Sequence, residues 1–124
     1  MPNFILYRRP RRYEIDPEEV YLYVGREGGH IRIHKSDAEK LGDWVRIYYD
    51  DGHRLIVLTP SGPDDPYAIS IRHRNRSFRI YALTLLRELG VNESRPAPAR
   101  WLGDVFVISL DGRFPEKIPE LRGE

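Results

Sequence analysis

The segment ISIRHRNRSFR, Ile69 to Arg79, holds the residue types best suited to binding a charged ligand. We expect a strand, a turn and a returning strand here, because apolar and polar residues alternate around a central polar run. In such a strand Arg72 and Arg74 lie on the face opposite Ile69 and Ile71. Guanidinium groups bind phosphate through paired hydrogen bonds. The segment therefore predicts one phosphate-binding patch, which consists of Arg72, Arg74, Arg76 and Arg79.

The alternative is that these arginines form ion pairs inside the protein. Between Pro66 and Arg87 there are five arginines and no acid, so any carboxylate partner must come from elsewhere in the chain. The candidate partners are Asp50, Asp51, Asp64, Asp65 and the acids of residues 14–19. A phosphate-binding role and a structural role both stay open from the residues alone.

A second polar strand face contains His30, Arg32 and His34, which alternate with Ile31 and Ile33. Two histidines four residues apart on a strand lie roughly 13 Å apart, too far for both to bind one metal ion. We therefore expect a surface role for this face and no metal site. Arg32 becomes a further candidate for contact with DNA.

The segment YRRPRRY, Tyr7 to Tyr13, combines aromatic and basic residues near the N-terminus. It is compatible with an arm that binds phosphate. It is also compatible with an edge strand that charge and proline protect from pairing with other chains. We favour the edge strand and expect residues 1–19 to form an N-terminal extension that contains it.

The composition excludes several classes of protein. The 124 residues suit one compact domain, or two small units that share a core, and 40% hydrophobic residues suffice for that core. No apolar run is long enough to cross a membrane. The absence of cysteine excludes disulfides and cysteine-bound zinc, so we expect a cytoplasmic protein. No motif of a phosphate loop or of a nucleophilic enzyme is present, which predicts a protein without enzymatic activity or cofactor.

Two stretches of equal length reveal an internal repeat. GHIRIHKSDAEKLG, Gly29 to Gly42, and SFRIYALTLLRELG, Ser77 to Gly90, each combine a strand with a short helix that ends in Leu-Gly. Ser36 and Glu39 suggest a capping box for the first helix, and Gly42 a left-handed end. The order strand–turn–strand–helix–strand–turn–strand occurs twice, in residues 20–60 and 66–111, and residues 112–124 are left as a C-terminal tail.

The repeat resembles the swapped-hairpin family of AbrB, SpoVT and MazE-type proteins. Residues 29–42 match the family's strand, short helix and closing Leu-Gly. RIYYDDGHRLIVLTP, Arg46 to Pro60, is similar to its second half, which has an acidic turn and an I-x-L-x-P ending. The first repeat departs from the family at His34 and the second at Ala82, where the family usually has proline.

This resemblance implies both a fold and a function. Members interlace the hairpins of two units into one barrel-like core, so this chain would form a mainly β, tandem swapped-hairpin pseudo-dimer with two short helices, as MraZ-like proteins do. It would be a monomeric pseudo-dimer or a homodimer. In AbrB-like proteins arginines of the hairpin and helix contact DNA, which implies a DNA-binding transcriptional regulator that uses Arg72, Arg79 and Arg87. The alternative is a non-enzymatic protein–protein module, antitoxin-like or a phage adaptor, that binds its partner through the terminal extensions.

Overall fold

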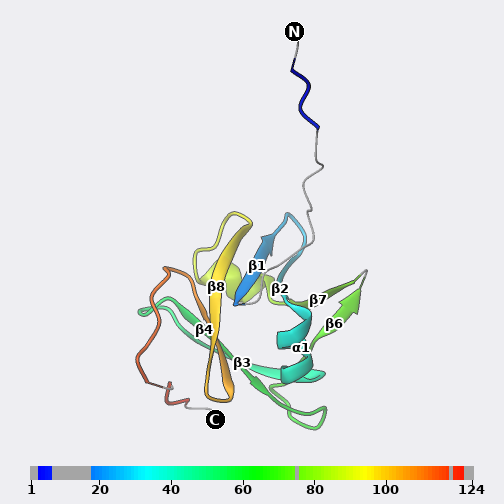
Figure 1. Cartoon of the computed structure of the whole chain (residues 1–124). Helices are drawn as coiled ribbons and strands as arrows, with labels where there is room; N and C mark the ends of the chain where they lie inside the picture. Colours follow the sequence, from blue (N-terminus) through cyan, green and yellow to red (C-terminus); the bar gives the residue numbers. More distant parts are fainter. Residues whose placement is uncertain (1–2, 7–17, 75, 118, 122–124) are drawn as a thin grey trace.

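A computed structural model describes residues 3–6, 18–74, 76–117 and 119–121. In this part of the chain nine strands form one antiparallel sheet with two short helices beside it (Figure 1). The first half holds β1 (Glu19–Val24), β2 (Gly29–Ile33), α1 (Lys35–Leu41), β3 (Trp44–Asp50) and β4 (Leu55–Pro60). The second half holds β5 (Ile69–Ser70), β6 (Arg72–Arg74), β7 (Ser77–Tyr81), α2 (Leu83–Glu88), β8 (Arg95–Leu102) and β9 (Val105–Ser109).

The sheet curls into a nearly closed barrel. Its strand order is β5-β3-β4-β9-β8-β1-β2-β7-β6. The two end strands, β5 and β6, are separated in the chain by Ile71 alone, so the two ends of the sheet lie side by side. The backbone N–H of Ile71 donates to the carbonyl of Asp43 at 2.9 Å and extends the pairing of β5 with β3. The predicted fold, mainly β and barrel-like with two short helices, is confirmed.

Both hairpins of the first half pair with strands of the second half. β1 pairs with β8 and β2 with β7, while β3 pairs with β5 and β4 with β9. In the described residues no ladder joins the β1–β2 hairpin to the β3–β4 hairpin. The two hairpins are therefore held in one sheet by the other half of the chain, which is the exchange of hairpins expected. The boundaries 20–60 and 66–111 themselves stay predictions.

Two central pairings place like residues opposite each other. Ile31 faces Ile80 where β2 meets β7, and both side chains are fully buried in the core. Val57 faces Val107 where β4 meets β9. The pairing of β1 with β8 likewise has its counterpart in that of β5 with β3. These pairings are those of two halves related by an approximate two-fold axis.

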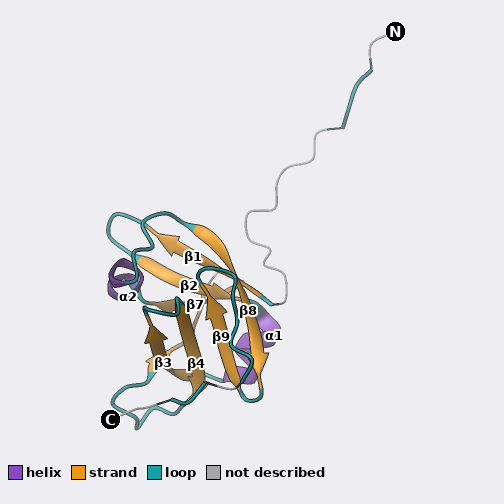
Figure 2. Ribbon diagram, turned by 90° about the vertical axis from the view of Figure 1, so that its left-hand side faces the viewer, coloured by secondary structure: helices purple, strands orange, loops and turns teal. Residues whose placement is uncertain are grey.

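The two helices lie on opposite sides of the barrel (Figure 2). A glycine with positive φ lies just after each helix, Gly42 at +86° and Gly90 at +74°, as the Leu-Gly pairs predict. After α2 the N–H of Gly90 donates to the carbonyl of Arg87, and the N–H of Val91 donates to the carbonyl of Leu86. These two carbonyls of the last turn, which have no partner within the helix, are thereby hydrogen-bonded.

The start of α1 differs from the prediction. His34, not Ser36, caps the helix, because the N–H of Ser36 donates to Nδ1 of His34 at 3.1 Å and the helix already begins at Lys35. Ser36 therefore lies within the first turn. Glu39 forms no capping box and instead pairs with Lys35 at 3.9 Å.

β8 begins at Arg95 and runs through Pro96 and Pro98. The N–H of Ala99 donates toward β1, to the carbonyl of Glu18 at 2.9 Å. Since N–H directions alternate along a strand, the two prolines lie on the other side, where β9 pairs only from Ala99 onward. They interrupt no ladder and are tolerated for that reason.

The N-terminal extension is only partly described. Asn3 to Leu6 form no strand. The YRRPRRY segment, where we expect the edge strand, lies outside the described residues. Within the described part of the chain, no helix has the length and apolar character needed to cross a membrane.

The apolar side chains form two clusters. The main core fills the barrel and includes residues of both halves, among them Leu22, Ile31, Leu41, Ile80, Leu89 and Phe106. A smaller cluster lies on the outside of β4 and β9, where Phe114 and Leu121 of the C-terminal segment pack against Val57, Val105 and Val107. The C-terminal tail therefore covers an apolar patch of the sheet.

Leu41 and Leu89 test whether both helices seal the shared core. They are 2% and 1% exposed. We expect Leu41→Ala and Leu89→Ala each to lower the free energy of unfolding by about 2–5 kcal/mol, because each leaves a cavity. Urea unfolding measures this, with Thr84→Ala at an exposed position of α2 as the control. If either leucine variant unfolds like the control, its helix does not pack as described.

Candidate nucleic-acid interface

The outer face of β1, β2, β7 and β6 gathers cationic and aromatic side chains. Side chains alternate along a strand, so the residues between the buried isoleucines and valines point outward. The strand register aligns them across four neighbouring strands. We call this surface the Arg–Tyr face, and it consists of Tyr21, Tyr23, His30, Arg32, Arg72, Arg79 and Tyr81.

One row of this face is cationic. Arg32 on β2 lies opposite Arg79 on β7, and Arg79 lies opposite Arg72 on β6. Tyr21 on β1 continues the row beyond Arg32, whose guanidinium lies 5.2 Å from the tyrosine ring centre. Neighbouring strands are about 4.8 Å apart, so the three arginines occupy adjacent backbone positions on neighbouring strands. The structure thus brings together Arg32, Arg72 and Arg79, which we call the arginine row. Its neighbours cover most of Arg32, so Arg72 and Arg79 present the row to solvent.

Ser77 holds the end of this row in place. Its Oγ accepts a hydrogen bond from Nε of Arg79 at 2.8 Å and donates one to the carbonyl of Arg74 at 2.8 Å. Arg74 lies on the same face as Arg72, and Arg76 follows in the turn with a φ of +65°. Both are exposed. Four of the predicted arginines therefore belong to one hairpin, and Ser77 orients one of them.

The acids proposed as structural partners are engaged elsewhere. Asp50 pairs with His53 at 2.6 Å, Asp51 with Arg54 at 2.9 Å and Asp65 with Arg46. Among the described residues no carboxylate forms an ion pair with Arg72, Arg74, Arg76 or Arg79. The acids of residues 14–17 lie outside the described part of the chain. Three of the four aspartates named as possible partners of these arginines therefore pair with other residues.

The second row of the face is aromatic. His30 lies between two tyrosines: its ring stacks on Tyr23 with centres 4.9 Å apart and meets Tyr81 edge-on at 5.8 Å. The two tyrosines are about two-fifths exposed, while His30 is buried. We call Tyr23, His30 and Tyr81 the tyrosine row. It runs beside the arginine row, at a distance of two residues along each of the strands β1, β2 and β7.

His30 is held in its neutral form. Burial, followed by the charges of Arg79 and Arg32, lowers its pKa from 6.5 to about 4. A second proton on this ring would add a third positive charge beside two guanidinium groups. At neutral pH the tyrosine row therefore carries no charge, although the arginine row next to it is fully cationic.

Arg87, also expected at this site, lies apart from the arginine row. On α2 it donates from Nη2 to the carbonyl of Arg26 at 3.3 Å, in the turn that joins β1 to β2. That turn is next to the tyrosine row. A cavity of about 330 Å³ lies between the two rows and the turn, and its lining includes Tyr23, His30, Arg79 and Tyr81.

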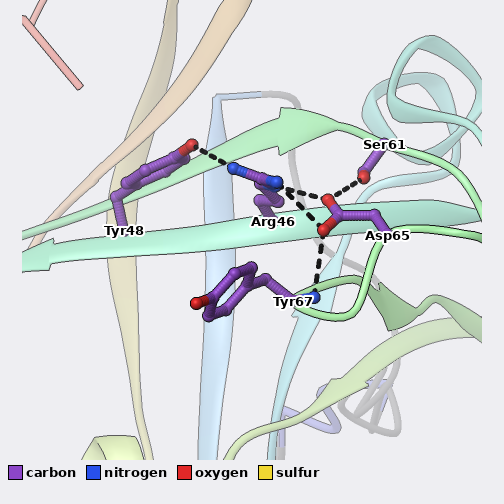
Figure 3. Close-up of polar contacts among 5 residues, drawn as sticks. All are labelled: Arg46, Tyr48, Ser61, Asp65 and Tyr67. Atoms are coloured by element: carbon purple, nitrogen blue, oxygen red, sulfur yellow. Dashed lines mark hydrogen bonds and ion pairs between the residues drawn. The ribbon is translucent and has the colours of Figure 1, made fainter. Parts of the chain in front are cut away.

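A separate polar network fixes the linker between the two halves (Figure 3). The carboxylate of Asp65 accepts hydrogen bonds from Nε and Nη2 of Arg46, from Oγ of Ser61 at 2.5 Å and from the N–H of Tyr67 at 3.0 Å. The bonds from Arg46 and then Ser61 hold the pKa of Asp65 well below its usual range. The network therefore anchors the Pro- and Gly-rich linker to β3.

The tyrosine row was missed from the sequence. A tyrosine in a strand is ordinarily a packing residue of the core or of a sheet face. The alternation in VYLYV does place Tyr21 and Tyr23 on one face, opposite Val20 and Leu22. What it does not reveal is the pairing of β2 with β7, which places Tyr81 beside His30.

The chain matches no protein-family model, and neither a curated protein nor a solved structure is significantly similar to it. The likeness to AbrB-type proteins therefore stays a prediction from the sequence.

The pKa of His30 predicts a pH-dependent stability. Below about pH 6.5 the unfolded chain binds a proton that the folded chain takes up only near pH 4. Stability should therefore fall with falling pH in this window, by at most about 1.4 kcal/mol per unit. In His30→Gln this contribution is absent, so the loss between pH 7 and pH 5 should be smaller. Urea unfolding at both pH values measures it, and equal losses in both proteins would show that His30 is not held neutral.

Asp65 predicts a second pH-dependent contribution, at the linker. Its pKa is lowered on folding, so it stabilises the fold above about pH 4 and loses this effect at lower pH. Asp65→Asn should melt earlier than the parent at pH 7, and the difference should shrink below pH 4. Thermal melts followed by circular dichroism test this. Asp64→Asn, at an exposed neighbouring position, is the control, and equal Tm values for both variants would contradict an anchoring role.

Proposed function

We propose that this protein is a non-enzymatic, cytoplasmic, DNA-binding transcriptional regulator that contacts DNA through the Arg–Tyr face and the exposed arginines of the β6–β7 hairpin beside it. The observation that supports it best is the arginine row. In this row Arg72 and Arg79 lie directly opposite each other on adjacent strands, where like charges repel. A DNA backbone would supply the negative charge that such a row attracts.

The chemistry of the side chains favours phosphate as the ligand. Arginine presents a planar fork that matches two phosphate oxygens, and it stays charged at any physiological pH. Arg72, Arg74 and Arg76 are exposed and lie on one hairpin, so they can follow a backbone of regularly spaced charges. The net charge of the whole chain is only +1, so the attraction would be local to this face.

A second candidate function is a protein–protein module that uses the N-terminal extension. Phe4, Ile5 and Leu6 favour it, because these consecutive apolar side chains are 92–93% exposed. Exposed apolar runs of this kind mark surfaces that associate with partners. The module would bind an apolar groove on another protein, and it would need no nucleic acid.

The arginines of the β6–β7 hairpin distinguish the two functions. We expect Arg72→Ala/Arg74→Ala to weaken binding to random-sequence DNA. The slope of log affinity against log salt should fall by about one unit for each phosphate that the variant no longer binds. The Tm should hardly change, because exposed arginines contribute little to stability. Electrophoretic mobility shifts at low and moderate salt measure the affinity.

Arg113→Ala/Lys117→Ala is the matched control, since it removes two exposed charges from the C-terminal segment. It should leave the salt slope unchanged. If the parent protein shifts no DNA even at low salt, DNA binding is wrong and the protein–protein module is favoured. If the Arg72→Ala/Arg74→Ala variant melts much earlier than the parent, the arginines are structural.

A further inference from the structure

The tyrosine row offers a type of contact that a phosphate does not use. Tyr23 and Tyr81 are 43% and 41% exposed, although they flank a buried histidine on a sheet face. Both rings contact His30, so the three side chains form one continuous aromatic surface. Continuous exposed patches, unlike single exposed rings, mark binding sites. Nucleic-acid bases stack on such rings whatever their sequence, because every base has two aromatic faces.

The spacing of the two rows matches the parts of one nucleotide. Residues two apart on a strand are separated by about 6.8 Å, so a ring of the tyrosine row lies close to a guanidinium of the arginine row. The guanidinium of Arg72, for example, lies over the ring of Tyr81, 5.7 Å from its centre. A base on the other face of Tyr81 would therefore leave its own phosphate within reach of Arg72 or Arg79.

The charges of the two rows also suit a base on the tyrosine row and its phosphate on the arginine row. His30 is neutral at physiological pH, with its pKa near 4, so the tyrosine row presents an uncharged aromatic surface. The groups that face His30 are Tyr23 on β1, Arg32 on β2, and Arg79 and Tyr81 on β7. The positive charge therefore lies on one side of the cavity and the aromatic surface on the other.

We propose that the Arg–Tyr face binds single-stranded nucleic acid, with unpaired bases on Tyr23 and Tyr81 and the phosphates on the arginine row. This rests on the proposed function, in which the same arginines bind phosphate. In a duplex each base face is covered by the next base pair, so the tyrosine row has nothing to stack on. A single strand leaves those faces free and uses both rows.

The test compares one labelled DNA oligonucleotide of about 12 nucleotides, a typical length for single-strand binders, with its duplex. Fluorescence anisotropy gives both affinities for the full chain. We expect the parent to bind the single strand more tightly. Tyr23→Leu/Tyr81→Leu should lower the single-strand affinity by about 5- to 150-fold for each ring that stacks a base, and should leave duplex binding nearly unchanged.

Two further variants make the result specific to stacking. Tyr23→Phe/Tyr81→Phe keeps the rings and should bind like the parent. Tyr49→Leu/Tyr67→Leu removes two tyrosines that are at least as exposed but lie outside the face, and it should also bind like the parent. Equal melting temperatures for all three variants would show that binding, and not folding, has changed.

The outcomes separate this inference from the proposed function. If the parent binds neither form of DNA at low salt, the proposed function fails and the inference fails with it. If Arg72→Ala/Arg74→Ala weakens binding but Tyr23→Leu/Tyr81→Leu does not, phosphate binding stands and base stacking is wrong. Equal affinity of the parent for the single strand and the duplex would also overturn the inference.

Discussion

Each hairpin of the first half depends on the second half for both of its outer partners. β1 and β2 are bordered by β8 and β7, and β3 and β4 by β5 and β9. Backbone groups left unpaired in a core are costly, and a unit of about 40 residues buries too little surface to be stable alone. Pairing between the halves is therefore a condition of folding. It also closes the sheet, because the two remaining ends, β5 and β6, are consecutive pieces of one chain.

The same pairing creates the candidate interface. β2 carries Arg32 and His30, and β7 carries Arg79 and Tyr81, so neither half alone holds a complete row. The contact of β2 with β7 lies near the approximate two-fold axis, where Ile31 faces Ile80 inside the barrel. Residues of the two halves thus meet on both sides of the sheet at one place. The inner side supplies stability, and the outer side presents the rows of arginine and tyrosine.

Local signals in the sequence were sufficient for most of the fold but not for the complete site. Alternation and the Leu-Gly pairs gave the strands and the two helices, because these depend on neighbouring residues. The cap at His34 was missed because Ser36 is the better capping residue by type. The arginines of the β6–β7 hairpin could be grouped since they are close in sequence. The position of Arg32 opposite Arg79 could not, because it depends on a pairing across about 47 residues.

A row of like charges persists on this face because the core fixes the register. A slip of β2 by one residue against β7 would move Arg32 away from its place opposite Arg79. Side chains alternate with a period of two, so that slip would exchange the faces and place Arg32 inside the barrel and Ile31 in water. A guanidinium in the apolar core and the loss of isoleucine burial would cost far more than the repulsion between charges on the outer face. The barrel core thus holds the arginines in a row that they would not adopt by themselves, and this preorganisation is what a ligand with regularly spaced phosphates would use.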